Sequence, residues 1–273
     1  MVKKLFKHEF LAYIRVMGIV YLILLAMATA GRIIWLFESD TIAFGIIGTF
    51  SNITYGISVA AAFGFMFVLG IVRFYKHLFT AEGYLSFTLP VTPAQHILVK
   101  IVTAVTMAAI TLVAVLLSGC IISAGELFVE ICKAAAYLWR AVYTEVSYQG
   151  ILMVIELIIL LILWCVSGLM LYYVFISIGQ LFKKNRILAA VGAYFVYYVA
   201  TQILSAIFLV VLSILGAAGA LDKLGEWLVY FIPVHPYIFI HSCVGIIALL
   251  TAVFIFVECI VVKMIITKRL NLE

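Results

Sequence analysis

Charged side chains are scarce in this sequence: Asp, Glu, Lys and Arg make up 11% of its 273 residues, while 67% are hydrophobic. A soluble domain carries roughly 25% charged and about 45–50% apolar residues. The mean hydropathy of +1.31 implies more apolar surface than a globular core of this length can bury. The composition therefore excludes a soluble protein and predicts an integral membrane protein.

Motifs for nucleotide binding and catalysis are also missing. The sequence has no G-x-x-x-x-G-K followed by Ser or Thr to cradle phosphates, no H-E-x-x-H zinc motif and no G-x-S-x-G nucleophile motif. Its five cysteines show no CxxC or Cys/His spacing, and its five histidines are scattered. We expect solvated or interfacial histidines rather than metal ligands. The sequence thus predicts a protein that is not an enzyme, with no catalytic, cofactor-binding or metal-binding residue.

Long apolar segments, in contrast, are abundant, and six of them reach the length of about 20 residues that a membrane-spanning helix needs. They cover 16–34, 46–72, 97–122, 151–178, 187–215 and 238–262. None shows the alternating polarity of a transmembrane β-strand. The pattern predicts an all-α polytopic protein, with an N-terminal amphipathic helix (1–15) and a six-helix transmembrane domain (16–273).

The basic residues are distributed unevenly between the two sides of these spans. Thirteen of the 17 lie near one set of helix ends, which includes both termini, the 73–96 loop and the 181–186 loop. The other four lie on the opposite side, where most acidic residues are found. The positive-inside rule therefore places both termini in the cytoplasm. The same asymmetry accounts for the net charge of +5 and makes the lipid bilayer the expected partner, rather than nucleic acid.

Three segments outside the spans have a character of their own. Residues 1–15 combine aromatic and apolar side chains with lysines, which suits a helix lying along the inner leaflet or a simple positive anchor. The outer loop 123–149 is expected to be partly helical. The outer loop 216–237 contains the apolar run 227–232, which is too short to span and predicts an interfacial or re-entrant segment.

Two carboxylates fall inside predicted spans. A carboxylate in hydrocarbon is costly, so each should face the helix bundle, a cavity or a cationic partner. Glu156 lies about two turns into the fourth span, and we predict that it faces either a substrate pathway or a partner helix. Glu258 lies near the inner end of the last span and is expected to pair with Lys263 or to reach the interface.

Small residues recur every fourth position in the second span. The set is Gly48, Asn52, Gly56, Ala60 and Gly64. Such spacing lets another helix approach closely. Packing within one subunit and a dimer interface are both consistent with it.

The loop after the second span is the most informative stretch. Its sequence RFYKHLFTAEGYLSFTLPV (73–91) is aromatic and amphipathic, although it lies on a basic, water-facing side. Exposed apolar residues of this kind indicate docking to a protein or to the membrane surface. This stretch resembles the coupling loop of six-helix ABC exporter permeases of Gram-positive bacteria, and the predicted layout of the whole chain is similar to theirs.

The resemblance implies a division of labour. Two permease subunits, identical or related, would form the substrate pathway in the bacterial cytoplasmic membrane. A separate ATPase subunit would bind ATP and magnesium and would push on the loop. The coupling role is carried over to Leu78, Phe79, Glu82, Tyr84 and Phe87.

Two other functions remain open from the sequence. An ion-driven secondary transporter would be expected to show inverted repeats and polar pairs near the midplane, and no convincing repeat relates 16–122 to 151–262. A membrane scaffold or assembly subunit would use the same docking loop without transport.

Overall fold

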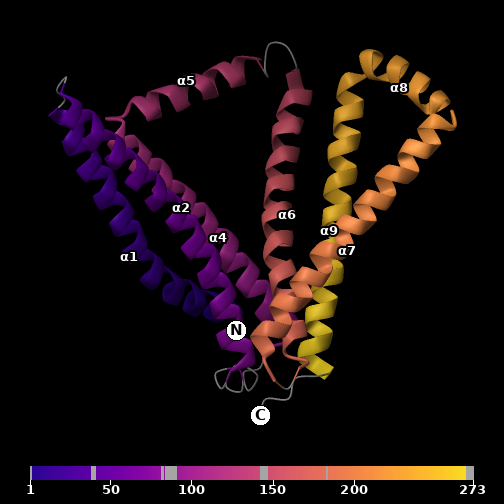
Figure 1. Cartoon of the computed structure of the whole chain (residues 1–273), viewed down its shortest axis with the longest axis horizontal. Helices are drawn as coiled ribbons and strands as arrows, with labels where there is room; N and C mark the ends of the chain where they lie inside the picture. The colour runs from indigo at the N-terminus through magenta and orange to yellow at the C-terminus, as the bar shows by residue number, and fades with distance from the viewer. Residues whose placement is uncertain are drawn as a thin grey trace. The chain divides into compact units, whose positions relative to one another are not determined.

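The computed structural model describes residues 2–37, 41–80, 83, 91–141, 147–182 and 184–268, and within them the chain is helical without any β-strand. The helices are α1 (Val2–Leu36), α2 (Ile42–Phe79), α4 (Pro93–Ile122), α5 (Glu126–Ala141), α6 (Ser147–Gly179), α7 (Arg186–Ala217), α8 (Asp222–Val234) and α9 (Pro236–Lys268) (Figure 1). Six of them, α1, α2, α4, α6, α7 and α9, are long and apolar enough to cross a membrane. The prediction of an all-α polytopic membrane protein is confirmed.

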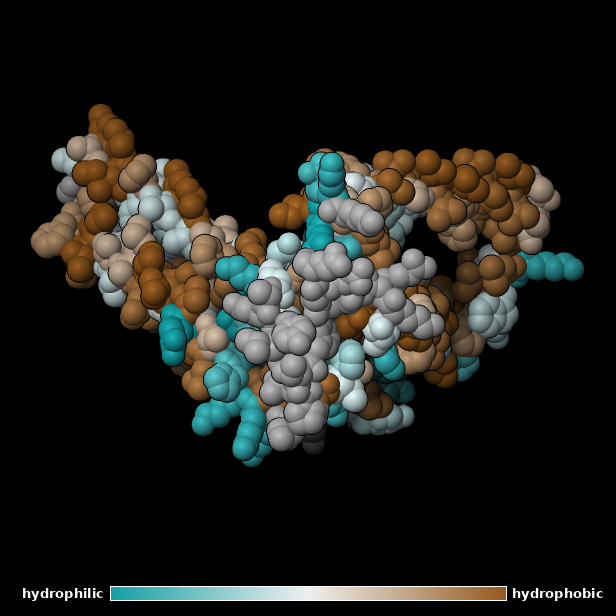
Figure 2. Space-filling view, turned by 90° about the horizontal axis from the view of Figure 1, so that it is seen from below, coloured by the Kyte–Doolittle hydropathy of each residue, from teal (hydrophilic) through white to brown (hydrophobic). Residues whose placement is uncertain are grey.

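Large apolar side chains cover much of the surface of these helices. Figure 2 shows apolar residues along most of the visible helix surfaces, with hydrophilic residues gathered mainly in the middle and lower part of the view. Trp164 and Leu204, for example, are 75% and 65% exposed. In water such exposure would be costly, whereas in a bilayer these side chains contact lipid.

The chain divides into two compact units, Met1–Ser147 and Tyr148–Asn271. Unit 1 contains α1, α2, α4 and α5, and unit 2 contains α6 to α9.

In unit 1, α1, α2 and α4 run side by side (Figure 1). The buried residues of α1 recur every three or four positions along its whole length, so that one stripe of the helix faces α2 and α4. They are Glu9, Tyr13, Met17, Tyr21, Leu24, Ala28 and Gly31. The centre of the core is formed by Tyr13, Met17, Tyr21, Met66 and Met107.

The N-terminal segment differs from the expectation. Residues 1–15 do not form a separate helix, because α1 runs without a break from Val2 to Leu36. No proline interrupts this stretch, and its buried stripe continues through the boundary at residue 15. A 35-residue helix is about 52 Å long, which exceeds the hydrocarbon thickness of about 30 Å. Contact of its first turns with the inner leaflet stays a prediction.

The loop after the second span is shorter than expected, because its first residues extend α2 as far as Phe79. The next helix begins with a complete capping box: the Thr92 side chain accepts from the Gln95 amide, and the Gln95 side chain accepts from the Thr92 amide. Pro93 follows at the first helical position, where its missing N–H costs nothing. These two ends define the base of the segment that resembles a coupling loop.

Both expected outer loops contain a helix. The 123–149 loop contains α5, whose described side chains Phe128, Val129 and Tyr137 are exposed. In the 216–237 loop, α8 joins α7 to α9 (Figure 1) and includes the whole predicted apolar run 227–232. The placement of α8 in the membrane interface stays a prediction.

In unit 2, α6 and α7 meet closely at the turn that joins them. Phe175 of α6 lies 5.6 Å from the ring of Tyr194 and 5.4 Å from the ring of Tyr197, measured between ring centroids. Nearer the turn, Gly179 is buried against the first turns of α7. The absence of a side chain at this position allows the two backbones to approach.

Gly179→Ala is expected to destabilise unit 2. An added Cβ would lie 2.5 Å from the carbonyl oxygen of Arg186 and 2.8 Å from Ala190 Cβ, and overpacking of this kind costs about 1–3 kcal/mol. The free energy of unfolding can be measured by titration with a denaturing detergent. Gly168→Ala is the matched control on the same helix, since its Cβ meets no atom within 4 Å and alanine favours a helix. Equal stability of the two variants would contradict the close approach of α6 and α7.

Candidate functional site

A buried carboxylate joins the three long helices of unit 1 beside the predicted coupling loop. Glu9 of α1 is 6% exposed. Its Oε2 lies 2.7 Å from a terminal guanidinium nitrogen of Arg73, at the end of α2, and 3.2 Å from Arg73 Nε. Its Oε1 lies 2.8 Å from Lys100 Nζ, near the start of α4, and 2.9 Å from His77 Nδ1. We call these four residues the Glu9 cluster.

The negative charge of Glu9 is balanced by the positive charges of Arg73 and Lys100 and by hydrogen bonds. Both carboxylate oxygens accept hydrogen bonds, and Arg73 binds one of them through two nitrogens. Lys100 also donates to the backbone carbonyl of Arg73, at 3.3 Å. A buried charge is tolerated only when it is paired and hydrogen-bonded in this way. The cluster therefore holds the ends of α1, α2 and α4 in one relative position.

Tyr13 extends this connection one turn further along α1. Its hydroxyl donates to the carbonyl oxygen of Met66 on α2. The Arg73 guanidinium carbon lies 5.8 Å from the centre of the Tyr13 ring, a cation–π distance. Gly70 makes room for this contact, since a Cβ there would lie 3.0 Å from the Tyr13 hydroxyl.

The sequence did not reveal the Glu9 cluster. The sequence predicts Arg73 and Lys100 on the positive cytoplasmic side, with Arg73 also in the resembling stretch 73–91, and it places Glu9 in the amphipathic segment 1–15. The available signal was a single carboxylate among the lysines of 1–15. Which cations it meets depends on how three helices pack.

The predicted coupling residues are only partly within the described structure. Leu78 and Phe79 end α2 and are buried, at 0% and 5% exposed, and Phe79 packs edge-on against Phe74. Glu82, Tyr84 and Phe87 lie outside the described residues. Between them, Gly83 packs so closely on the end of α2 that an added Cβ would lie 2.7 Å from the Leu78 carbonyl oxygen. The coupling role of all five stays a prediction.

The small residues that recur every fourth position in α2 fall into two groups, one in contact with α1 and one exposed. Gly48 is in contact with α1, since a Cβ there would lie 3.3 Å from the Trp35 ring, and Asn52 accepts a hydrogen bond from Trp35 Nε1 at 3.3 Å. Gly56, Ala60 and Gly64 are exposed, and a Cβ at either glycine meets nothing within 4 Å. The buried face of α2 follows a different stripe, at 62, 66, 70, 74 and 78. A subunit interface at the exposed part stays a prediction.

Unit 2 contains a carboxylate–imidazole pair inside two spanning helices. Glu156 Oε2 of α6 lies 2.7 Å from His241 Nδ1 of α9. Both side chains are partly buried, at 32% and 22% exposed. A carboxylate in an apolar helix needs a partner, and the His241 ring supplies one. His241 lies near the first turns of α9, and its position at the membrane interface stays a prediction. Whether Glu156 borders a substrate pathway stays a prediction.

Of the two alternatives predicted for Glu258, the structure does not show the pairing with Lys263, and a position at the membrane interface stays a prediction. No ion pair joins it to Lys263 within the described residues, and its buried Oε2 has no hydrogen-bond partner there. Lys263 lies five positions further along α9, which places it on a different face of the helix from Glu258.

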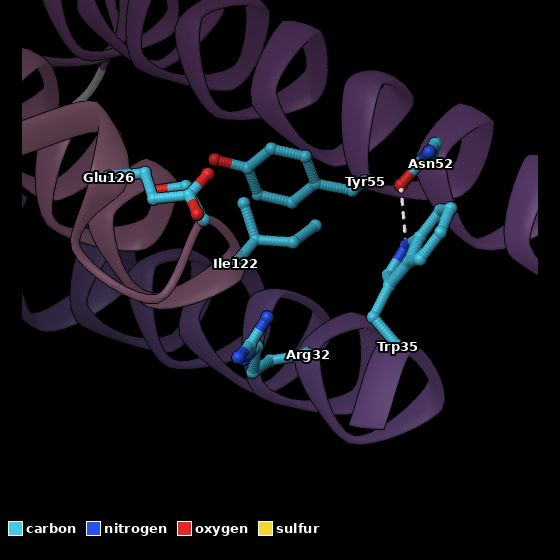
Figure 3. A pocket seen from close by; sticks show the side chains of 7 residues that line it. Arg32, Trp35, Asn52, Tyr55, Ile122 and Glu126 are labelled. Carbon is cyan, nitrogen blue, oxygen red and sulfur yellow. Dashed lines mark hydrogen bonds between the residues drawn. The ribbon is translucent and has the colours of Figure 1, made fainter. Parts of the chain in front are cut away.

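A polar pocket of about 440 Å³ lies at the end of unit 1 opposite the Glu9 cluster. It is lined by Arg32 and Trp35 of α1, Asn52 and Tyr55 of α2, Ile122 of α4 and Glu126 of α5. Figure 3 shows Trp35 and Asn52 joined on one side and Glu126 on the other, with Tyr55 and Ile122 between them and Arg32 below. We call it the Arg32 pocket.

Comparison of the chain with protein-family models, with characterised proteins and with solved structures finds no significant match.

Glu9→Gln is expected to destabilise unit 1 by about 3–5 kcal/mol, because it leaves buried cations without their counter-charge. Adding Lys100→Met to Glu9→Gln should restore part of the loss by removing one of these cations. Unfolding in a denaturing detergent measures both effects. Glu130→Gln is the control, since Glu130 pairs with Lys133 at 3.0 Å on the exposed surface of α5 and such pairs contribute about 0–1 kcal/mol. A loss no larger than that of the control would show that the Glu9 cluster does not hold the helices.

Glu156→Gln and His241→Gln are expected to be non-additive. Residues in direct contact show coupling energies of about 0.5–3 kcal/mol, so the double variant should lose less stability than the sum of the single variants. Glu258→Gln with His241→Gln is the control, because these positions are 17 residues apart on α9 and should be independent. Additive losses in both cycles would contradict the pairing of Glu156 with His241.

Proposed function

We propose that this chain is the membrane-spanning permease subunit of an ATP-driven exporter. Two copies, or one copy and a related chain, form the substrate pathway in the bacterial cytoplasmic membrane, with both termini in the cytoplasm. A separate ABC-type ATPase carries ATP and magnesium and binds the loop after α2. The six apolar helices provide the membrane part that such an assembly requires.

The observation that carries this proposal is the position of the Glu9 cluster. It ties the last turns of α2, where the resembling segment 73–91 begins, to the first turns of α4, which follow that segment, and it connects both to α1. A push on the loop would therefore reach three helices together instead of bending one helix end. A docking loop that transmits force needs such a rigid base, because coupling between distant sites is carried by rigid elements and packed contacts.

The charge distribution supports the orientation. Arg73, Lys100 and the lysines of 1–15 gather at the same end of unit 1, whereas Arg32 is the only basic side chain near the opposite ends of its three long helices. Under the positive-inside rule this end faces the cytoplasm. An ATPase would then meet the loop from the compartment that supplies ATP.

A second candidate function is an ion-driven secondary transporter. The Glu156–His241 pair favours it, since ionisable side chains inside spanning helices are typical of proton relays. In that case collapse of the proton gradient, rather than depletion of ATP, would stop transport. Glu156→Gln would then abolish transport while leaving the protein inserted.

Tyr84→Ala and Glu82→Ala are expected to leave membrane insertion intact and to abolish stimulation of the ATPase. The test is purification of the tagged chain from mild-detergent membranes of its host, followed by identification of co-purified proteins and measurement of ATP turnover. A stoichiometric P-loop ATPase should co-purify with the unaltered chain, and changes within 76–87 should weaken its binding. Lys223→Gln on α8, at the other side of the membrane, is the control.

Two results would overturn the proposal. Recovery of the chain without any ATPase, under conditions that preserve a known complex, would favour the secondary transporter or a scaffold. Normal binding and normal turnover with both loop variants would show that the coupling role lies elsewhere.

A further inference from the structure

The polar groups of the Arg32 pocket fall into two classes. Some are already engaged within the protein: Trp35 Nε1 donates to Asn52 Oδ1, and the Tyr55 hydroxyl lies 2.8 Å from Ser118 Oγ. Ser123 Oγ at the rim donates to the Gly119 carbonyl and accepts from the Leu127 amide. These bonds fix the walls of the pocket.

Other polar groups in the Arg32 pocket have no partner among the described residues. The Arg32 guanidinium makes no hydrogen bond or ion pair there, and neither does the Glu126 carboxylate. The amide nitrogen of Asn52 is also available, because only its oxygen is bonded. The pocket therefore offers five guanidinium N–H donors and an amide on one side, and an acceptor carboxylate on the other.

The surroundings of the pocket are those of a membrane interface. It lies where α4 ends at Ile122 and the exposed amphipathic helix α5 begins. Trp35 and Tyr55 line it, and such aromatic residues are enriched at the level of the lipid headgroups. Beside Arg32 on α1, Ile33 and Leu36 are 55% and 65% exposed, so the pocket adjoins a lipid-facing surface.

We propose that the Arg32 pocket binds the headgroup of an amine-containing phospholipid in the leaflet at this end of unit 1. Arg32 binds the phosphate through two parallel N–H donors, a geometry that guanidinium groups favour. Asn52 donates to a further phosphate oxygen, and Glu126 pairs with the ammonium group. The volume of about 440 Å³ lies within the range of small-molecule sites, about 300–1,000 Å³.

The pairing of opposite charges distinguishes this site from a general attraction to anionic lipid. A patch that binds any anionic headgroup needs basic residues alone, and Glu126 would repel a second negative charge. An amine headgroup satisfies both Arg32 and Glu126, with no net charge to neutralise. This lipid site requires only that the chain is inserted in a membrane, and it does not depend on the proposed coupling to an ATPase.

The test uses the full chain in nanodiscs containing equal amounts of phosphatidylethanolamine and phosphatidylglycerol. After release into mild detergent, native mass spectrometry counts the lipids that stay bound. The unaltered chain should retain phosphatidylethanolamine preferentially. Arg32→Gln should lower its retention at least about tenfold, which corresponds to about 1.4 kcal/mol, close to the lower limit for one hydrogen bond to a charged group. Arg32→Lys should give an intermediate loss, since it keeps the charge without the planar fork.

Further variants separate this site from its alternatives. Glu126→Gln should retain phosphate lipids but lose the preference for the amine headgroup. Lys133→Gln, an exposed change on α5, should behave as the unaltered chain. Equal retention of phosphatidylethanolamine by Arg32→Gln and the unaltered chain would overturn the proposal. Displacement of the lipid by millimolar inorganic phosphate would also overturn it, because the site would then bind free phosphate.

Discussion

Hydrocarbon offers no hydrogen bonds to a peptide group, and the architecture of this chain follows from that constraint. Helices satisfy their own backbone, so the described structure is helical throughout, with six helices able to cross a bilayer. Their apolar side chains remain on the surface because lipid, unlike water, does not drive them inside. Packing between the helices then depends on small residues and on polar contacts. Gly179 is an example of a small residue of this kind, since it lets α7 approach α6.

In both units a carboxylate lies in an apolar environment and needs a polar partner, but the partners differ. In unit 1, Glu9 of α1 pairs with basic side chains of α2 and α4. These pairs offset the cost of burying its charge and hold the three helices together. In unit 2, Glu156 contacts a single imidazole, that of His241. The charged groups of the Arg32 pocket have no partner among the described residues and are available to a ligand. The first arrangement suits a rigid base, and the pocket suits a binding site.

The class of fold could be predicted from composition and segment length, because both are set by the solvent around the chain. The six spans were predicted to within about four residues of their observed ends, apart from three ends where a helix continues further. These are residues 2–15, which extend α1, 73–79, which extend α2, and 263–268, which extend α9. Hydropathy reports where the lipid ends, whereas a helix ends only where its backbone geometry changes.

The sequence by itself determined that the chain is an integral membrane protein, how many times it can cross the bilayer, and that Glu156 should face the helix bundle, a cavity or a cationic partner. Only the tertiary structure decided which groups meet: Glu9 with Arg73 and Lys100, Glu156 with His241, and Arg32 with Asn52 and Glu126 around one pocket. The physical reason is distance along the chain. Glu9 and Lys100 are 91 positions apart and Glu156 and His241 are 85 apart, so no local periodicity relates them. Their contacts depend on the rotation and depth of whole helices, which packing alone sets.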